Sequence, residues 1–450
     1  MTMEAPKKSI KGSPTMAIDI KKIYQAFDPA PLSAEQTDLY VDLDAVRGSS
    51  GLVDRLAQNI RLSASPTCQL LAGHRGSGKS TELRRLQREL ESGKEKYFAV
   101  FCEILDDIEP NDVDFPDVLI SIIRQTAKQL RERVSIELKP GYFKQRWDEA
   151  KDFLSREVDL NSLELDVGLA KLSAAIKSSP NTRIEIRKLL EPRTNSWIEA
   201  ANDVLGQAVL ELSKKNYSGL VIIVDGLDKM TLRPHPTVGC STAEYLFAER
   251  HAQLTAFKCH VIYTIPIALA YSCRERDIAN LYGHTPPVVP MTMISNADGK
   301  KNKAGFDKFA DLIRKRLQKA SAEEKDVFES GDIRDKIIEY SGGQPRELIT
   351  LIRDSIIEGP LPITSAMVQN VARKIRHAYA RQLREEHWAI IEQVKRDHIP
   401  NRTGENDTLC MELLDNRAIL QYENSGEWYG VNPLLPSPPN SKKSKNEHKR

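Results

Sequence analysis

Residues 73–80 contain the side chains of this 450-residue chain that most clearly could do chemistry. They fit the pattern G-x-x-x-x-G-K-[ST] in full and read Gly73, His74, Arg75, Gly76, Ser77, Gly78, Lys79 and Ser80. Glycines let backbone N–H groups converge on phosphates, while Lys79 should reach the β- and γ-phosphates and the Ser80 hydroxyl should ligate Mg²⁺. We therefore predict a site for ATP and Mg²⁺ here, extended by Thr81 at the start of the next helix.

A carboxylate ends the second chemical motif. Residues 221–224 are β-branched and Asp225 follows them directly. In a buried parallel strand, an acid at the carboxyl end faces the crevice where ligands bind. Asp225 is thus predicted to hold the water shell of Mg²⁺. Asp228, three residues later, either orients the attacking water or caps the N-terminus of a helix.

Two further residues are candidates for contact with the nucleotide. Thr264 ends the predicted strand 260–264, where its hydroxyl could sense the γ-phosphate or the water, or be an ordinary strand-end threonine. Arg346 follows Gly-Gly-Gln-Pro and opens a helix, a position whose dipole disfavours a cation. A residue placed against local preference often meets a ligand, so we predict that Arg346 reaches the phosphates; the alternative is a surface ion pair.

Strands and helices, which the sequence shows by different periodicities of apolar residues, must position these side chains. Short β-branched runs alternate with longer helical patterns, which predicts an α/β fold with a five-stranded parallel sheet covered by helices. The candidate strands are 67–72, 97–102, 220–225, 260–264 and 287–291. A long, mostly helical insertion is expected at about 142–212, although the alternation of Leu163, Leu165, Val167 and Leu169 would also suit a short peripheral strand.

The predicted domains follow from these patterns. The nucleotide-binding domain spans 16–295 and a small helical domain, the lid, spans 296–360. A final unit at 361–435 has a long helix, a helix near 408–414 and two strands at 418–422 and 428–431 joined by a turn. Residues 1–15 and 436–450 are polar and are expected to be disordered.

Charge and hydropathy exclude some classes of function. Lys and Arg number 65 against 63 Asp and Glu, so DNA binding through a global field is not expected. The N-terminus has no apolar segment of the secretory type, and no stretch suits a membrane span, so the cytoplasm is the expected location.

Taken together, these motifs resemble those of the AAA+ and STAND NTPases, with origin-recognition-type initiators and NACHT-like signalling ATPases as the most similar branches. The resemblance covers roughly residues 40–360 and implies the strand order 5-1-4-3-2. It makes Lys79 and Ser80 the Walker A pair, Asp225 the Walker B aspartate, Thr264 sensor 1 and Arg346 sensor 2.

One position departs from the AAA+ pattern. Gly226 stands where most of those enzymes place a catalytic glutamate, and Lys229 stands where STAND proteins often have an acid. The resemblance then implies slow turnover and puts Asp228 as catalytic base in doubt. Candidates for an arginine finger are Arg250, Arg274 and Arg276.

The C-terminal unit looks like a winged helix. Its candidate recognition segment is acidic, with Glu405, Asp407, Glu412 and Asp415, and an acidic helix fits poorly against phosphates. We therefore expect a slowly hydrolysing switch ATPase that couples nucleotide state to lid movement and to a protein partner or self-assembly. The resemblance also suggests bacterial signalling or phage defence; the alternative is a nucleic-acid-associated ATPase of the initiator or transposition type.

Overall fold

The computed structural model describes residues 19–33, 35–48, 51–139, 141, 165–235, 238–404, 406–424 and 426–438, with only the backbone for 165–168. The predicted disordered segment 1–15, the tail beyond 438 and the first part of the insertion, 142–164, lie outside this description.

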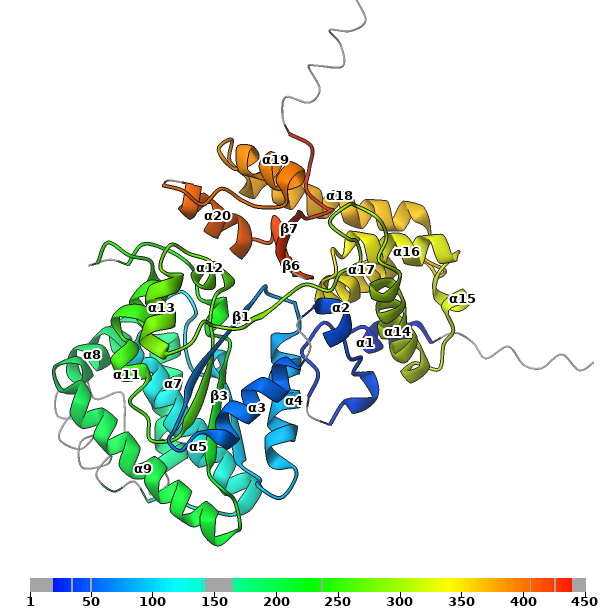
Figure 1. Cartoon of the computed structure of the whole chain (residues 1–450). Helices are drawn as coiled ribbons and strands as arrows, with labels where there is room; N and C mark the ends of the chain where they lie inside the picture. Colours follow the sequence, from blue (N-terminus) through cyan, green and yellow to red (C-terminus); the bar gives the residue numbers. More distant parts are fainter. Residues whose placement is uncertain are drawn as a thin grey trace, which may run out of the picture.

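A five-stranded parallel sheet forms the centre of the larger part of the molecule (Figure 1). Its strands lie in the order β2-β3-β4-β1-β5, which confirms the predicted fold class and the strand order 5-1-4-3-2. The strands are β1 (Cys68–Gly73), β2 (Phe98–Glu103), β3 (Leu220–Asp225), β4 (His260–Thr264) and β5 (Val288–Val289). The strands are parallel, so the carboxyl ends of β1 and β3 lie at the same edge of the sheet. The P-loop, which follows β1, and Asp225, which ends β3, therefore come together at that edge.

Helices cover both faces of the sheet, which explains why its strands read as continuous apolar runs. Alternate residues of each strand enter two separate cores; in β3, for example, Ile222 packs on one side and Ile223 on the other. One core is closed by α3 (Leu52–Leu62) and α4 (Lys79–Glu91). The other is closed by α5 (Phe115–Val134), α7 (Leu165–Ser178), α8 (Pro180–Leu190), α9 (Thr194–Lys214) and α13 (Glu275–Tyr282).

The described part of the insertion is helical. Residues 165–178 form α7, so the suggestion of a peripheral strand through Leu165, Val167 and Leu169 is wrong, and Leu163 lies outside the described residues. Burial explains the difference, because Leu169 and Leu172 pack against the sheet core as successive turns of one helix. Asp112 holds α8 in place by ion pairs of 2.8 and 2.7 Å to Arg183 and Arg187.

The lid is a bundle of helices with its own core, and the start of the described chain packs into it. Ile23 and Phe27, from the segment around α1 (Ile20–Ala26), share one apolar cluster with the lid residues Phe309 and Ile313. The lid helices are α14 (Lys303–Lys319), α15 (Glu324–Val327), α16 (Gly331–Tyr340) and α17 (Pro345–Ile357). The N-terminal segment thus joins the lid although about 280 residues separate them in sequence.

The C-terminal unit consists of three helices and a hairpin, and it lies over the P-loop edge of the sheet (Figure 1). Its elements are α18 (Ser365–Gln382), α19 (His387–Asp397), α20 (Asn406–Asp415), β6 (Ile419–Glu423) and β7 (Glu427–Val431). The two strands pair antiparallel, as expected for a wing. Strand β6 is buried against the chain after β5, where Leu420 and Tyr422 pack on Met291 and Met293.

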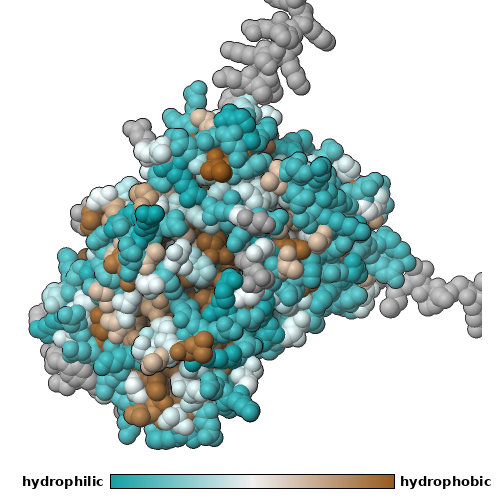
Figure 2. All heavy atoms as spheres, viewed as in Figure 1, coloured by the Kyte–Doolittle hydropathy of each residue, from teal (hydrophilic) through white to brown (hydrophobic). Residues whose placement is uncertain are grey.

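The face in Figure 2 is mostly hydrophilic, with apolar residues in small groups. Within the described residues, no helix is both long and apolar enough to cross a bilayer.

Candidate nucleotide site

Glycines shape the loop between β1 and α4 because the backbone there adopts conformations that side chains disfavour. Gly76 has φ +87° and Gly78 has φ +105°. A Cβ on Gly76 would lie 3.1 Å from the Cβ of Arg346, and one on Gly78 would lie 2.8 Å from a nitrogen of Arg47. The loop is therefore closely enclosed by Arg346 of the lid on one side and by Arg47 on the other, which leaves little room for side chains at these two glycines.

Lys79 is folded back onto its own loop. Its Nζ donates to the carbonyls of Gly73 and His74 at 2.6 and 2.9 Å, and it lies 2.8 Å from Oδ2 of Asp228. Burial alone would raise the pKa of Asp228, but Lys79 outweighs it and the pKa is lowered. Asp228 is therefore the ion-pair partner of the P-loop lysine and not a helix cap, since the short helix that contains it has no side-chain cap.

Asp225 has the properties of a cation ligand. It is buried, its Oδ1 has no hydrogen-bond partner, and its other interactions include a hydrogen bond with Ser80. Burial, and then the charge of Asp228, raise the pKa of Asp225. A bound Mg²⁺ would satisfy the unpaired oxygen and offset this cost, so the pair Ser80 and Asp225 fits the predicted metal.

Thr264 braces the end of β3. Its Oγ1 accepts a hydrogen bond from the N–H of Gly226 at 2.9 Å and lies 3.4 Å from the carbonyl oxygen of Val224. A Cβ on Gly226 would meet Ile104 and Leu105 at 3.3 Å, so a glutamate at this position would force those side chains to move. The structure thus places Thr264 beside the Walker B end, with its hydroxyl already bonded to backbone.

Arg346 lies where the lid meets the P-loop, in the first turn of α17. Its backbone N–H points to the carbonyl of Gly76 at 3.5 Å, and its side chain lines the pocket with Lys79 and Ser80. Within the described residues its guanidinium forms no ion pair, so the alternative of a surface ion pair is not supported. Burial lowers the pKa of Arg346, while Asp228 opposes this effect.

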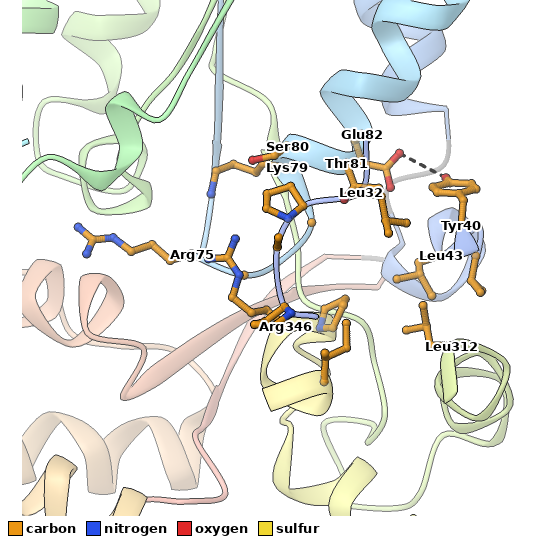
Figure 3. A pocket seen from close by; sticks show the side chains of 18 of the residues that line it. Leu32, Tyr40, Leu43, Arg75, Lys79, Ser80, Thr81, Glu82, Leu312 and Arg346 are labelled. Carbon is orange, nitrogen blue, oxygen red and sulfur yellow. Dashed lines mark hydrogen bonds between the residues drawn. The ribbon is translucent and has the colours of Figure 1, made fainter. Parts of the chain in front are cut away.

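The pocket also has an apolar end that sequence reasoning missed. Figure 3 shows Leu43 and Leu312 close together beside Tyr40, on the side away from Arg75. The apolar lining comes from the chain before the P-loop and from the lid, and includes Pro31, Leu32, Val41, Leu43, Leu312 and Ile349. A flat base would pack here while its phosphates reach Lys79. No motif in the sequence marks these residues, because each is an ordinary apolar residue and only the folded chain brings the lid and the segment before the P-loop together.

Two P-loop side chains bind the C-terminal unit. His74 is completely buried, with Nδ1 3.2 Å from the carbonyl oxygen of Leu414 and Nε2 accepting from the N–H of Gln421 at 2.9 Å. Arg75 lines the pocket and also pairs with Asp415 at 3.4 Å. The imidazole of His74, predicted to serve the nucleotide, therefore faces the winged-helix unit.

Of the arginine-finger candidates, two are already paired. Arg250 contacts Asp114 and Glu191, and Arg274 contacts Glu249 at 3.1 Å.

The strand order is that of an AAA+-like fold, the P-loop and the Asp225 strand end lie together at its edge, and the C-terminal unit has the helices and hairpin of a winged helix. Searches against protein-family models and characterised proteins gave no match. The chain is similar to the ORC2 protein of Aeropyrum pernix, solved as ADPNP and ADP complexes, with 12% identity over 94% of this chain and 95% of that one and a TM-score of 0.39. It is also similar to Cdc6p from Pyrobaculum aerophilum, with 14% identity over 91% and 94% of the two chains and a TM-score of 0.34. The description of the fold as AAA+-like therefore rests on this chain's own strand order.

Proposed function

We propose that this protein is an ATP-binding switch ATPase in which the nucleotide state sets whether the C-terminal unit stays docked on the P-loop. The observation that carries the proposal is the direct bonding of His74 and Arg75 to α20 and β6. Both residues belong to the loop that must adjust around phosphates. A ligand shifts such an equilibrium only through its different affinities for the two states, and a shared loop supplies that difference.

The ion pair between Lys79 and Asp228 is the proposed trigger. For Lys79 to reach the β- and γ-phosphates, it must leave its contacts with Asp228 and the loop carbonyls. Asp228 then loses its counter-ion while its negative charge still acts on Arg346 and Asp415, since it acts to raise the pKa of both. Nucleotide entry would thereby redistribute charge on both the lid and α20.

Hydrolysis is proposed to be slow. Mg²⁺, held by Ser80 and Asp225, would neutralise charge on the phosphates. The residue after Asp225 is a glycine, and the next acid along the chain, Asp228, is held by Lys79. A carboxylate with a lowered pKa is a weak proton acceptor, so we expect about one turnover per minute or less, against a median of ~10 s⁻¹ for enzymes.

The partner is proposed to be a protein or a second copy of the chain. In this docked arrangement α20 could not enter a DNA groove, because Leu414 and Asp415 are held at the P-loop. The described acids of α20 are also engaged: Glu412 pairs with Arg384, and Asp407 accepts from the N–H of Cys273 at 3.3 Å. Partner binding through α20 would thus follow release of the unit.

A nucleic-acid-associated ATPase is the second candidate, favoured by the exposed cations Arg373, Lys374 and Arg381 on α18. We expect the full chain to bind duplex DNA only feebly at ~0.15 M salt, in the non-specific range of about 10⁻⁴ M. Submicromolar binding that increases with ATP would favour this candidate over the protein-partner switch.

Hydrogen exchange of residues 406–423 tests the switch directly. We expect this segment to be most protected in the empty chain, less protected with ADP, whose β-phosphate also draws Lys79 away from Asp228, and to exchange fastest with Mg²⁺ and a non-hydrolysable ATP analogue. Calorimetry on the same samples establishes that the nucleotide is bound. Equal protection in all three states, with binding demonstrated, would exclude nucleotide control of docking.

A further inference from the structure

A single arginine in the lid is buried without a counter-ion. Three arginines of the described chain are less than 5% exposed: Arg47, Arg183 and Arg316. Arg47 pairs with Glu82 at 3.0 Å and Arg183 with Asp112 at 2.8 Å. Arg316 has no carboxylate partner among the described residues; its one hydrogen bond runs to the carbonyl of Leu312 at 3.3 Å, and its Nε has none.

Such an arrangement is costly in the empty protein. Arginine is almost never fully buried unless it is paired, because its charge loses the solvation of water. In agreement with this, burial lowers the pKa of Arg316 to about 10. The charged side chain therefore lacks a counter-charge, and beyond the carbonyl of Leu312 the described residues supply it with no hydrogen-bond acceptor.

The location of Arg316 identifies that acceptor. It lines the nucleotide pocket together with Leu43, Leu312 and Ile349, at the apolar end that we assign to the base. On its other side, beyond residues 28–32, a second hollow is bordered by Lys22 and Lys319 and also by Asp28, Gln25 and Gln36, but Arg316 forms no hydrogen bond or ion pair with any of these side chains. Arginine has five donors and no acceptor, so its partner must present lone pairs. The ring nitrogens of a purine do so.

We propose that Arg316 donates hydrogen bonds to the base of the bound nucleotide and so ties α14 of the lid to the nucleoside, while Arg346 ties α17 to the phosphates. This inference rests on the proposed nucleotide site, and it adds a specificity residue to it. Closure of the lid then depends on contacts with both the base and the phosphates of the nucleotide. The residue contributes only when a base is present.

Replacement by methionine separates this role from a structural one. Arg316→Met should leave the melting temperature of the empty protein unchanged or raise it, because a buried, unpaired charge is replaced by an apolar side chain of similar length. It should nevertheless weaken ATP and ADP binding about tenfold to hundredfold, the loss expected for charge-assisted hydrogen bonds. The same factor for ATP, ADP and 2′-deoxy-ATP, with no loss for inorganic tripolyphosphate, would place the contact on the nucleoside, and not on the phosphates or the 2′-hydroxyl.

Arg183→Met is the matched control, since it removes an equally buried arginine that has a partner. We expect it to lower the melting temperature, because Asp112 loses one of its cations, and to leave nucleotide affinity unchanged. Affinity within twofold of the parent in Arg316→Met would overturn the inference and point to an anion in the second hollow. A melting temperature that falls as in Arg183→Met would also overturn it. Failure of either kind leaves the switch itself untouched, because docking is measured by exchange and not by affinity.

Discussion

Lowering the pH should release the C-terminal unit through His74. Burial, and then the charge of Lys79, lower the pKa of His74 to about 3 in the docked state. Arg417 acts in the same direction, and the carbonyl of Leu414 opposes it. A released, hydrated histidine would titrate near 6.5, so the docked state binds fewer protons than the released one. Docking stability is therefore complete above about pH 6.5 and is lost as the pH falls below it.

The size of this effect follows from the two pKa values. Between pH 7 and pH 5 the released state gains a proton on His74 that the docked state refuses, which shifts the equilibrium about 25-fold, or about 2 kcal/mol. Protonation would place a hydrogen on Nε2, which now accepts from the N–H of Gln421. Asp415 opposes the shift, because burial raises its pKa in the docked state.

Hydrogen exchange at residues 419–423, corrected for intrinsic rates, measures the opening. We expect the opening constant to rise about 25-fold at pH 5 in the parent and to show little of this rise in His74→Gln, which cannot titrate. Because Asp415 is unchanged in this variant, the difference between the parent and His74→Gln isolates the part of the pH dependence that is due to His74. His260→Gln removes another histidine with a lowered pKa, at the start of β4 and far from α20, and should behave as the parent. Identical pH dependence in the parent and in His74→Gln would refute the reasoning.

Four further variants test the site. Lys79→Ala should abolish measurable ATP binding in calorimetry and also destabilise the chain by about 3–5 kcal/mol, because it leaves Asp228 buried and unpaired; adding Asp228→Asn should restore the melting temperature but not binding. Asp225→Asn should lose Mg²⁺-dependent turnover while keeping or raising stability, and turnover equal to the parent would remove Asp225 from the metal site. Asp228→Ala should reduce an already slow turnover, and an unchanged rate would place the base elsewhere. Arg346→Ala should retain most nucleotide affinity but lower ATP-induced protection of the lid from proteolysis about tenfold, and equal protection would exclude it as the coupling residue.

The chemical centre of this protein was readable in its sequence because its signals are local. The glycines and Lys79 lie within a few positions of one another, and the glycines permit the loop conformation that the motif requires. The β-branched run before Asp225 indicates a buried strand without reference to the rest of the chain. The fold class followed from the same periodicities. The strand order needed the family resemblance, since spacing alone does not say which strands are neighbours.

Other assignments needed the tertiary structure. Asp228 suited both a base and a cap, and only the folded chain shows that it pairs with Lys79. The insertion was predicted to be mostly helical, but the alternation around Leu165 would also have suited a short strand, and packing against the sheet core shows that this segment is a helix. The imidazole of His74 appeared to belong to the phosphates until α20 and β6 were seen to bind it.

The sequence by itself therefore indicated which residues are candidates to hold phosphates and a metal, because these candidates depend on side chains a few positions apart. The tertiary structure decided what surrounds them: the apolar pocket shared by residues 29–32, residues 40–43 and the lid, the buried Arg316 without a carboxylate partner among the described residues, and the C-terminal unit docked on the P-loop. Such contacts join segments more than 200 residues apart. They arise from the closing of separate cores on one another, and no periodicity or motif along the chain records them.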